Sequence, residues 1–206
     1  MKYVIRKVPE RNTLYLERLL PDALIVNDER HNGCIWSFLK AIEVADDDAI
    51  YIQDDMLLCK DFVIRAEEYM SLHRNEIVIF STPFLKGKKE YNGDKIIEKE
   101  GYYEPAEAFW QLCTYIPKCI SQKFLQFWLT GEYKTVSACN KYLKMQADDL
   151  FFRRFLERYE YGKVFVTVPN LAGHEENKSV VCQSRPKRIS PMFNYNEAEA
   201  KFEGEK

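Results

Sequence analysis

The fold class follows from Ala49-Ile50-Tyr51-Ile52-Gln53-Asp54-Asp55, an apolar run that ends in two adjacent carboxylates. A short apolar run of this kind predicts a buried strand. Apolar residues return at once in Met56-Leu57-Leu58, and carboxylates between two buried segments are costly unless they are paired or bind a metal. A strand that delivers aspartates at its carboxyl end is a common way to hold a divalent cation against phosphate oxygens. The alternative is a strand-end turn whose carboxylates stay solvated.

Strands and helices alternate on both sides of this run. Further strands are predicted at 3–5, 23–26, 76–80 and 164–168. Helices are predicted at 13–20, 34–45, 62–73, 121–129 and 148–161, with Asp61 as a possible cap for 62–73. The segment 84–104, rich in glycine and charge, predicts a loop or hairpin. This alternation predicts an α/β domain over residues 1–194, built on a mostly parallel sheet with helices on both faces, followed by a polar tail at 195–206.

The composition excludes some classes of protein. The formal net charge of the 206 residues is -2, so a contact with a polyanion would have to come from a local patch. The six cysteines form no C-x-x-C pair, and no stretch reads as a signal peptide or a membrane span. We therefore expect free thiols in a cytoplasmic protein without a membrane partner (host cytoplasm if phage-encoded), as a monomer or small homo-oligomer.

Two later motifs carry further chemistry. Asp148 and Asp149 open an amphipathic helix, where a carboxylate can cap the helix or act as a general base. His174 follows an apolar strand at 164–168, where it is either a metal ligand or an ordinary core or surface histidine.

In the order of these motifs the chain resembles the GT-A glycosyltransferases, a Rossmann-like fold that binds nucleotide-sugars. The resemblance covers about residues 2–193 and is carried by Asp28, Gln53-Asp54-Asp55, Asp148-Asp149-Leu150 and the segment 169–179. The D-x-D hallmark of the family appears here without its first aspartate.

The resemblance implies a role for each residue. Asp55 and His174 would bind the metal, with Asp54 at the ribose or sharing the cation. Asp149 would be the catalytic base, with Asp148 as the helix cap. The residues expected to bind the nucleotide-sugar are Arg6, Asp28, Asp54, Ser179, Arg185, Lys187 and Arg188. The alternative for the cluster 185–188 is a solvated surface run.

The function expected from the resemblance is transfer of a hexose from a UDP-type donor to an acceptor hydroxyl, with Mn²⁺ or Mg²⁺ neutralising the diphosphate. A hydroxymethylated pyrimidine in phage DNA and a surface glycan are the candidate acceptors. One alternative is a sugar-phosphate nucleotidyltransferase, which is disfavoured because the first glycine is Gly33, too late for a phosphate loop after the first strand. The other is a non-catalytic module that binds nucleotide-sugars.

Overall fold

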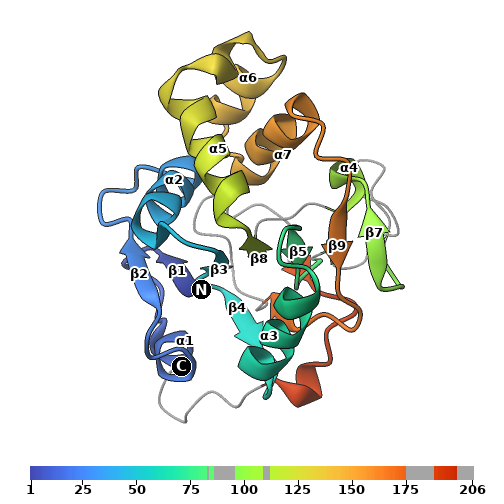
Figure 1. Ribbon diagram of the computed structural model, residues 1–206. Helices are drawn as coiled ribbons and strands as arrows, with labels where there is room; N and C mark the ends of the chain where they lie inside the picture. Colours follow the sequence, from blue (N-terminus) through green and yellow to red (C-terminus); the bar gives the residue numbers. More distant parts are fainter. Residues whose placement is uncertain (83, 86–95, 109–111, 175–187, 199–206) are drawn as a thin grey trace.

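The computed structural model describes residues 1–82, 84–85, 96–108, 112–174 and 188–198. Its centre is a seven-stranded sheet (Figure 1). The strand order is β2 (Leu24–Asn27), β1 (Lys2–Lys7), β3 (Ala49–Gln53), β8 (Cys113–Ile116), β5 (Val78–Ile79), β9 (Val164–Val166) and β7 (Gly101–Tyr103). All strands run the same way except β8 and β7, which are antiparallel to their neighbours. The predicted α/β fold with a mostly parallel sheet is confirmed.

Helices cover both faces of the sheet (Figure 1). On one face lie α2 (Cys34–Ala45), α5 (Lys118–Leu129) and α7 (Asp148–Arg158), and on the other lie α1 (Leu14–Leu19) and α3 (Phe62–Leu72). Successive side chains of a strand point to opposite faces. Val4 and Tyr51 therefore belong to the core between the sheet and α2. Ile5 and Ile52 belong to the core on the opposite face, between the sheet and helices α1 and α3.

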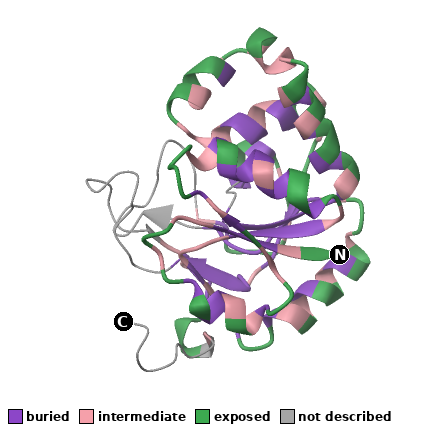
Figure 2. Ribbon diagram, turned by 90° about the vertical axis from the view of Figure 1, so that its left-hand side faces the viewer, coloured by how far each residue is buried: buried purple, intermediate pink, exposed green. Residues whose placement is uncertain are grey.

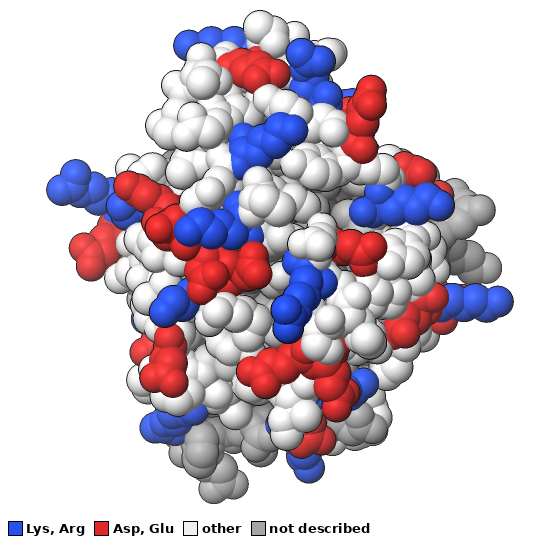
Figure 3. Space-filling view, viewed as in Figure 1, with Lys and Arg blue, Asp and Glu red and all other residues white. Residues whose placement is uncertain are grey.

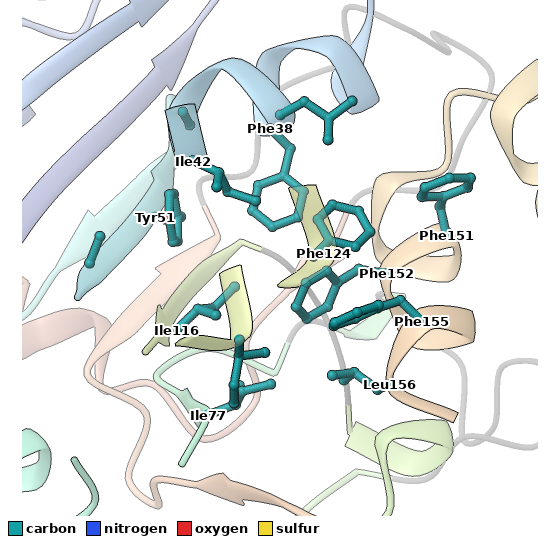
Figure 4. Close-up of a cluster of buried hydrophobic side chains, with 14 of the residues drawn as sticks. Phe38, Ile42, Tyr51, Ile77, Ile116, Phe124, Phe151, Phe152, Phe155 and Leu156 are labelled. Atoms are coloured by element: carbon teal, nitrogen blue, oxygen red, sulfur yellow. The ribbon is translucent and has the colours of Figure 1, made fainter. Parts of the chain in front are cut away.

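The larger helices are fixed by aromatic packing. Phe38 of α2, Phe124 of α5 and Phe152 of α7 meet with ring centroids 4.7 to 5.4 Å apart (Figure 4). Burial is concentrated in the sheet and in the inward sides of these helices (Figure 2). This cluster holds the amino end of α7 beside the carboxyl end of the sheet.

Smaller elements complete the fold. They are β4 (Met56–Leu58), β6 (Phe84–Leu85), α4 (Pro105–Ala108), η1 (Glu132–Thr135), α6 (Cys139–Lys144), β10 (Ala172–His174), β11 (Arg188–Ile189) and η2 (Tyr195–Glu197). Strand β4 pairs with β10 and β6 pairs with β11, each antiparallel. No helix within the described ranges has the length and hydropathy that a membrane span requires. The five cysteines that the structure describes are free thiols.

The structure corrects several local predictions. Asp61 makes no side-chain hydrogen bond as a cap of α3. Helix α5 begins at Lys118, directly after Pro117, three residues before the predicted start. Strands β4, β8 and β10 were not predicted, because each has only three or four residues and no alternating pattern that separates it from its surroundings. The first residues of the predicted tail are attached to the domain, since Ala198 bridges to Cys59.

Candidate functional site

The first part of the site lies at the turn between β3 and β4. Asp54 and Asp55 form this turn, and β4 pairs with β10 so that Met56 is opposite His174. The pairing brings Asp55 Oδ2 within 3.2 Å of His174 Nε2. Arg11, in the loop after β1, places its Nη2 3.7 Å from the same oxygen. The two predicted metal ligands are thus neighbours in space although 119 positions separate them in the sequence.

The spacing of Asp55 and His174 fits a shared cation. Two ligands at right angles, each about 2.1 Å from an ion, are about 3 Å apart. The observed 3.2 Å, at which the two side chains pair directly, is close to that separation, and both side chains are largely buried, at 12% and 6% exposed. No group of three or more His, Cys, Asp or Glu side chains in the described ranges could hold a metal ion. A cation here would therefore take its remaining ligands from water or from a bound phosphate, as Mg²⁺ and similar ions commonly do.

Asp54 lies on the side of the turn that faces β1. Its Oδ2 accepts a hydrogen bond from the backbone amide of Val8 at 3.0 Å. Burial and, to a smaller extent, the neighbouring carboxylate of Asp55 raise the pKa of Asp54 from 3.8 to about 6. Two adjacent carboxylates with little access to water are stabilised when a proton or a cation binds to them. The negative charge of this turn therefore favours binding of a cation.

The second part of the site joins β1 to α7. Arg6 points to the same face as Val4, where α2 and α7 pack, because side chains alternate along the strand. Its Nη2 lies 2.5 Å from Asp148 Oδ2 and also donates to the carbonyl of Cys34 at 3.0 Å, while its Nε donates to Ser37 Oγ. Arg6 and Asp148 are 4% and 7% exposed. They form a buried ion pair that joins strand β1 to α7, and the other bonds of Arg6 join the strand to α2.

This pair changes the interpretation of Asp148. The residue at the amino-terminal cap of α7 is Ala147, and no side chain makes a capping hydrogen bond there. The prediction that Asp148 caps the helix is wrong, because Asp148 is the first helical residue and its carboxylate turns toward Arg6. Asp149 is half-buried, and its Oδ1 accepts from the amide of Leu150 at 2.9 Å. Of the two aspartates, Asp149 is the one that a substrate could reach.

The two parts lie in one electrostatic environment at the amino end of α2. The pKa of Cys34 is raised to about 12, mainly by burial and also by the charges of Asp148, Asp149 and Asp54, whereas Arg6 acts to lower it. All four charged groups therefore act on one thiol. The structure gathers the carboxylates that the sequence places near positions 54 and 148 around the carboxyl ends of β1 and β3.

Other predicted nucleotide contacts are engaged within the fold. Asp28 is 2% exposed, and its carboxylate accepts from the amide and side chain of Asn32 and from the amide of Gly33, all at 2.8 Å. These bonds fix the loop before α2. Arg6 is similarly engaged within the fold, and its Nη1 is buried without a hydrogen-bond partner in the described residues.

The remaining predicted residues lie mostly outside the described part of the chain. Ser179, Arg185 and Lys187 are not described. The backbone of Arg188 pairs with Leu85 in the small sheet of β11 and β6, and its side chain is not described. Their predicted roles stay predictions.

Two residues that support His174 were not predicted. The hydroxyl of Ser190 accepts from the amide of His174 at 3.1 Å. The hydroxyl of Tyr195 donates to the carbonyl of His174 at 3.1 Å and accepts from the amide of Ser190 at 3.0 Å. The only signal in the sequence is a tyrosine at the start of an otherwise polar tail. Tyr195 therefore fixes the end of β10 that carries the histidine.

Comparisons with known proteins bear on the fold alone. No protein-family model matches the chain, and no curated protein matches it in sequence. Among solved structures, the chain is similar to A197 from STIV, with a TM-score of 0.53 and 14% sequence identity. The match covers 98% of this chain and 100% of that one. The likeness extends over the whole α/β architecture and carries no statement about activity.

Proposed function

We propose that this protein is a metal-dependent glycosyltransferase of the GT-A type, which moves a sugar from a nucleoside diphosphate to an acceptor hydroxyl. One observation carries the proposal. Asp55, at the end of β3, lies 3.2 Å from His174 of β10, and Asp54 and Asp149 both lie near enough to Cys34, at the start of α2, to raise the pKa of its thiol. In open α/β sheets, ligands bind outside the carboxyl ends of the strands.

The roles follow from the chemistry of each group. Asp55 and His174 would hold Mn²⁺ or Mg²⁺, which when bound neutralises the diphosphate of the donor. Asp149 would accept the proton of the acceptor hydroxyl as its oxygen bonds to the anomeric carbon of the sugar. The bond between that carbon and the diphosphate oxygen breaks, and the electron pair leaves with the nucleoside diphosphate. Arg11, 3.7 Å from Asp55, would lie close enough to compensate the charge on the leaving group.

Release of free nucleotide from a panel of nucleotide-sugars tests the proposal. The protein is incubated with each donor and Mn²⁺, and nucleoside diphosphate is measured over time, with Asp149→Asn as the matched control. We expect release from at least one UDP-sugar by the wild-type protein and at least a hundredfold less by the variant, the range that loss of a general base produces. Binding of the donor with no release by either protein would indicate a non-catalytic module. Release of pyrophosphate from a nucleoside triphosphate would indicate a nucleotidyltransferase.

A further inference from the structure

The helices at one end of the molecule differ in charge from the rest of it. Residues 118–158, which we call the helical cap, comprise α5, η1, α6 and α7. The cap contains eight Lys or Arg and four Asp or Glu, a formal charge of +4, whereas the remaining residues carry 22 and 28, a formal charge of -6. A protein with a net charge of -2 therefore has a distinctly basic region in its helical cap.

Acidic residues of the cap are engaged within the protein. Asp148 is bound to Arg6 outside the cap. Glu132 accepts from the hydroxyl of Tyr159 at 2.6 Å and lies 3.4 Å from Arg158 Nε. Glu157 lies 2.5 Å from Arg154 Nη1. Glu132 and Glu157 thus compensate the arginines of α7, Asp148 compensates Arg6, and none of the three pairs with a lysine of η1 or α6.

The outer part of the cap presents these lysines to solvent. Lys134, Lys141 and Lys144 are exposed, and within the described residues none of them forms an ion pair. Lys141 and Lys144 are one turn apart on α6, so they share a face of the helix, and η1 packs against α6. The exposed side chains of Ser137 and Asn140 lie in the same stretch and can donate hydrogen bonds. Figure 3 shows Lys and Arg side chains on the surface over α5 and α6.

The basic stretch connects directly to the candidate site. Gln146 follows α6, and its Oε1 accepts from the amide of Ile35 in the first turn of α2 at 3.4 Å. A side chain at Gly33 would collide with the same Gln146, since a Cβ there would lie 2.3 Å from Oε1. Asp149 comes three residues after Gln146. The basic stretch is therefore followed directly in the chain by the helix that carries the proposed base.

We propose that η1 and α6 form a binding surface for the phosphate backbone of a nucleic acid. Lysines together with Ser and Asn side chains are the groups that contact phosphate oxygens. A membrane fits the surface less well, because α6 has six residues and the large exposed apolar side chains, Leu129 at 65% and Met145 at 50%, stand at opposite ends of the stretch. If the bound nucleic acid is the acceptor of the sugar, this inference rests on the proposed function. Binding of nucleic acid by the surface does not depend on that function.

Binding of a fluorescein-labelled 20-base-pair duplex, measured by fluorescence anisotropy at increasing NaCl and without nucleotide-sugar, tests the proposal. Each phosphate that is neutralised adds about 0.9 to the slope of log K against log salt, so we expect a slope near -3 for three lysine contacts. Substitution of Lys134, Lys141 and Lys144 by Ala should reduce that slope to near zero and weaken binding at 50 mM NaCl at least tenfold. The matched control substitutes the exposed Lys60, Lys99 and Lys163, which lie outside the cap, and should leave the slope unchanged.

Three outcomes would overturn the proposal: no binding at 50 mM NaCl, an equal loss in both triple variants, or binding to phosphatidylserine vesicles in place of duplex. Lys141→Glu is a second, single variant and should weaken binding without a change in thermal stability. Because the assay contains no donor sugar, failure of glycosyl transfer would leave its result intact. Transfer to a glycan with no duplex binding would support the proposed function and reject this surface.

Discussion

The guanidinium of Arg6 and the carboxylate of Asp148 meet at 2.5 Å in the protein interior, although 142 positions separate them in the sequence. Arg6 belongs to strand β1, which lies beside β3 in the sheet, and Asp148 begins α7. Through this pair the sheet that carries Asp54 and Asp55 determines where α7 begins and hence where Asp149 lies. The ion pair between Arg6 and Asp148 therefore links the two parts of the candidate site.

We expect Arg6→Met to lower the free energy of unfolding by about 3 kcal/mol, because a buried carboxylate loses its partner. Urea denaturation at pH 7 measures the change. The control is Lys40→Ala, which removes an exposed ion pair with Glu43 and should cost less than about 0.5 kcal/mol. The double variant Arg6→Met with Asp148→Leu should recover part of the loss, since it removes both charges. Equal costs for Arg6→Met and Lys40→Ala would contradict a stabilising role for the pair.

The pKa of Asp54 predicts the pH dependence of its substitution. Because the pKa is about 6 in the folded protein against an ordinary 3.8, protonated Asp54 contributes stability below about pH 4, and this contribution is lost as the pH rises through 6. We therefore expect Asp54→Asn, which keeps an acceptor for the amide of Val8, to stabilise the protein by roughly 1 to 3 kcal/mol at pH 7.5 and not at pH 4. Denaturation at the two pH values measures this difference. A gain of the same size at both would show that the ionised carboxylate is not the cause.

Binding of Mn²⁺ should depend on Asp55 and His174. Calorimetric titration of UDP with Mn²⁺, and again with EDTA, measures the contribution of the cation. We expect at least tenfold weaker UDP binding in EDTA and in Asp55→Asn or His174→Asn, because each variant removes a ligand. His73→Asn is the control, since His73 pairs with Glu76 away from the site. Unchanged affinity in EDTA would remove the metal from the proposal.

Asp149→Asn should retain donor binding and abolish transfer, because the amide preserves the shape of the side chain and cannot accept the proton. Thermal melting should show a small change, since the amide can still accept the hydrogen bond that Asp149 Oδ1 accepts from the amide of Leu150. Asp148→Asn should instead lower the melting temperature, through loss of charge opposite Arg6. Turnover that survives in Asp149→Asn would place the base elsewhere or indicate a retaining reaction.

Removal of the Tyr195 hydroxyl should loosen β10. Tyr195→Phe loses the bonds to the carbonyl of His174 and the amide of Ser190, each worth about 1 kcal/mol. We expect faster amide hydrogen exchange at His174 and several-fold weaker Mn²⁺ binding. Tyr102→Phe, which removes a surface bond to Glu76, is the control and should change neither.

Local patterns in the sequence were sufficient for much of this architecture. Helix α2 was predicted because Ile35, Phe38, Leu39 and Ile42 recur at helical spacing, and the structure buries all four. The position of Asp54 and Asp55 followed from the apolar run before them, since a buried strand must end where charge begins. These features depend on neighbours a few positions away, so the sequence by itself determined them.

The tertiary structure decided which distant residues meet. The insertion of β8 between β3 and β5, the pairing of β10 with β4 that brings His174 to Asp55, and the turn of Asp148 toward Arg6 each join segments more than 30 positions apart. Asp148 had the features of a helix cap in the sequence, because a carboxylate at a helix start is favourable whatever faces it. The buried guanidinium of Arg6, on strand β1, is a stronger partner for the carboxylate of Asp148. No local pattern in the sequence indicates where that partner lies.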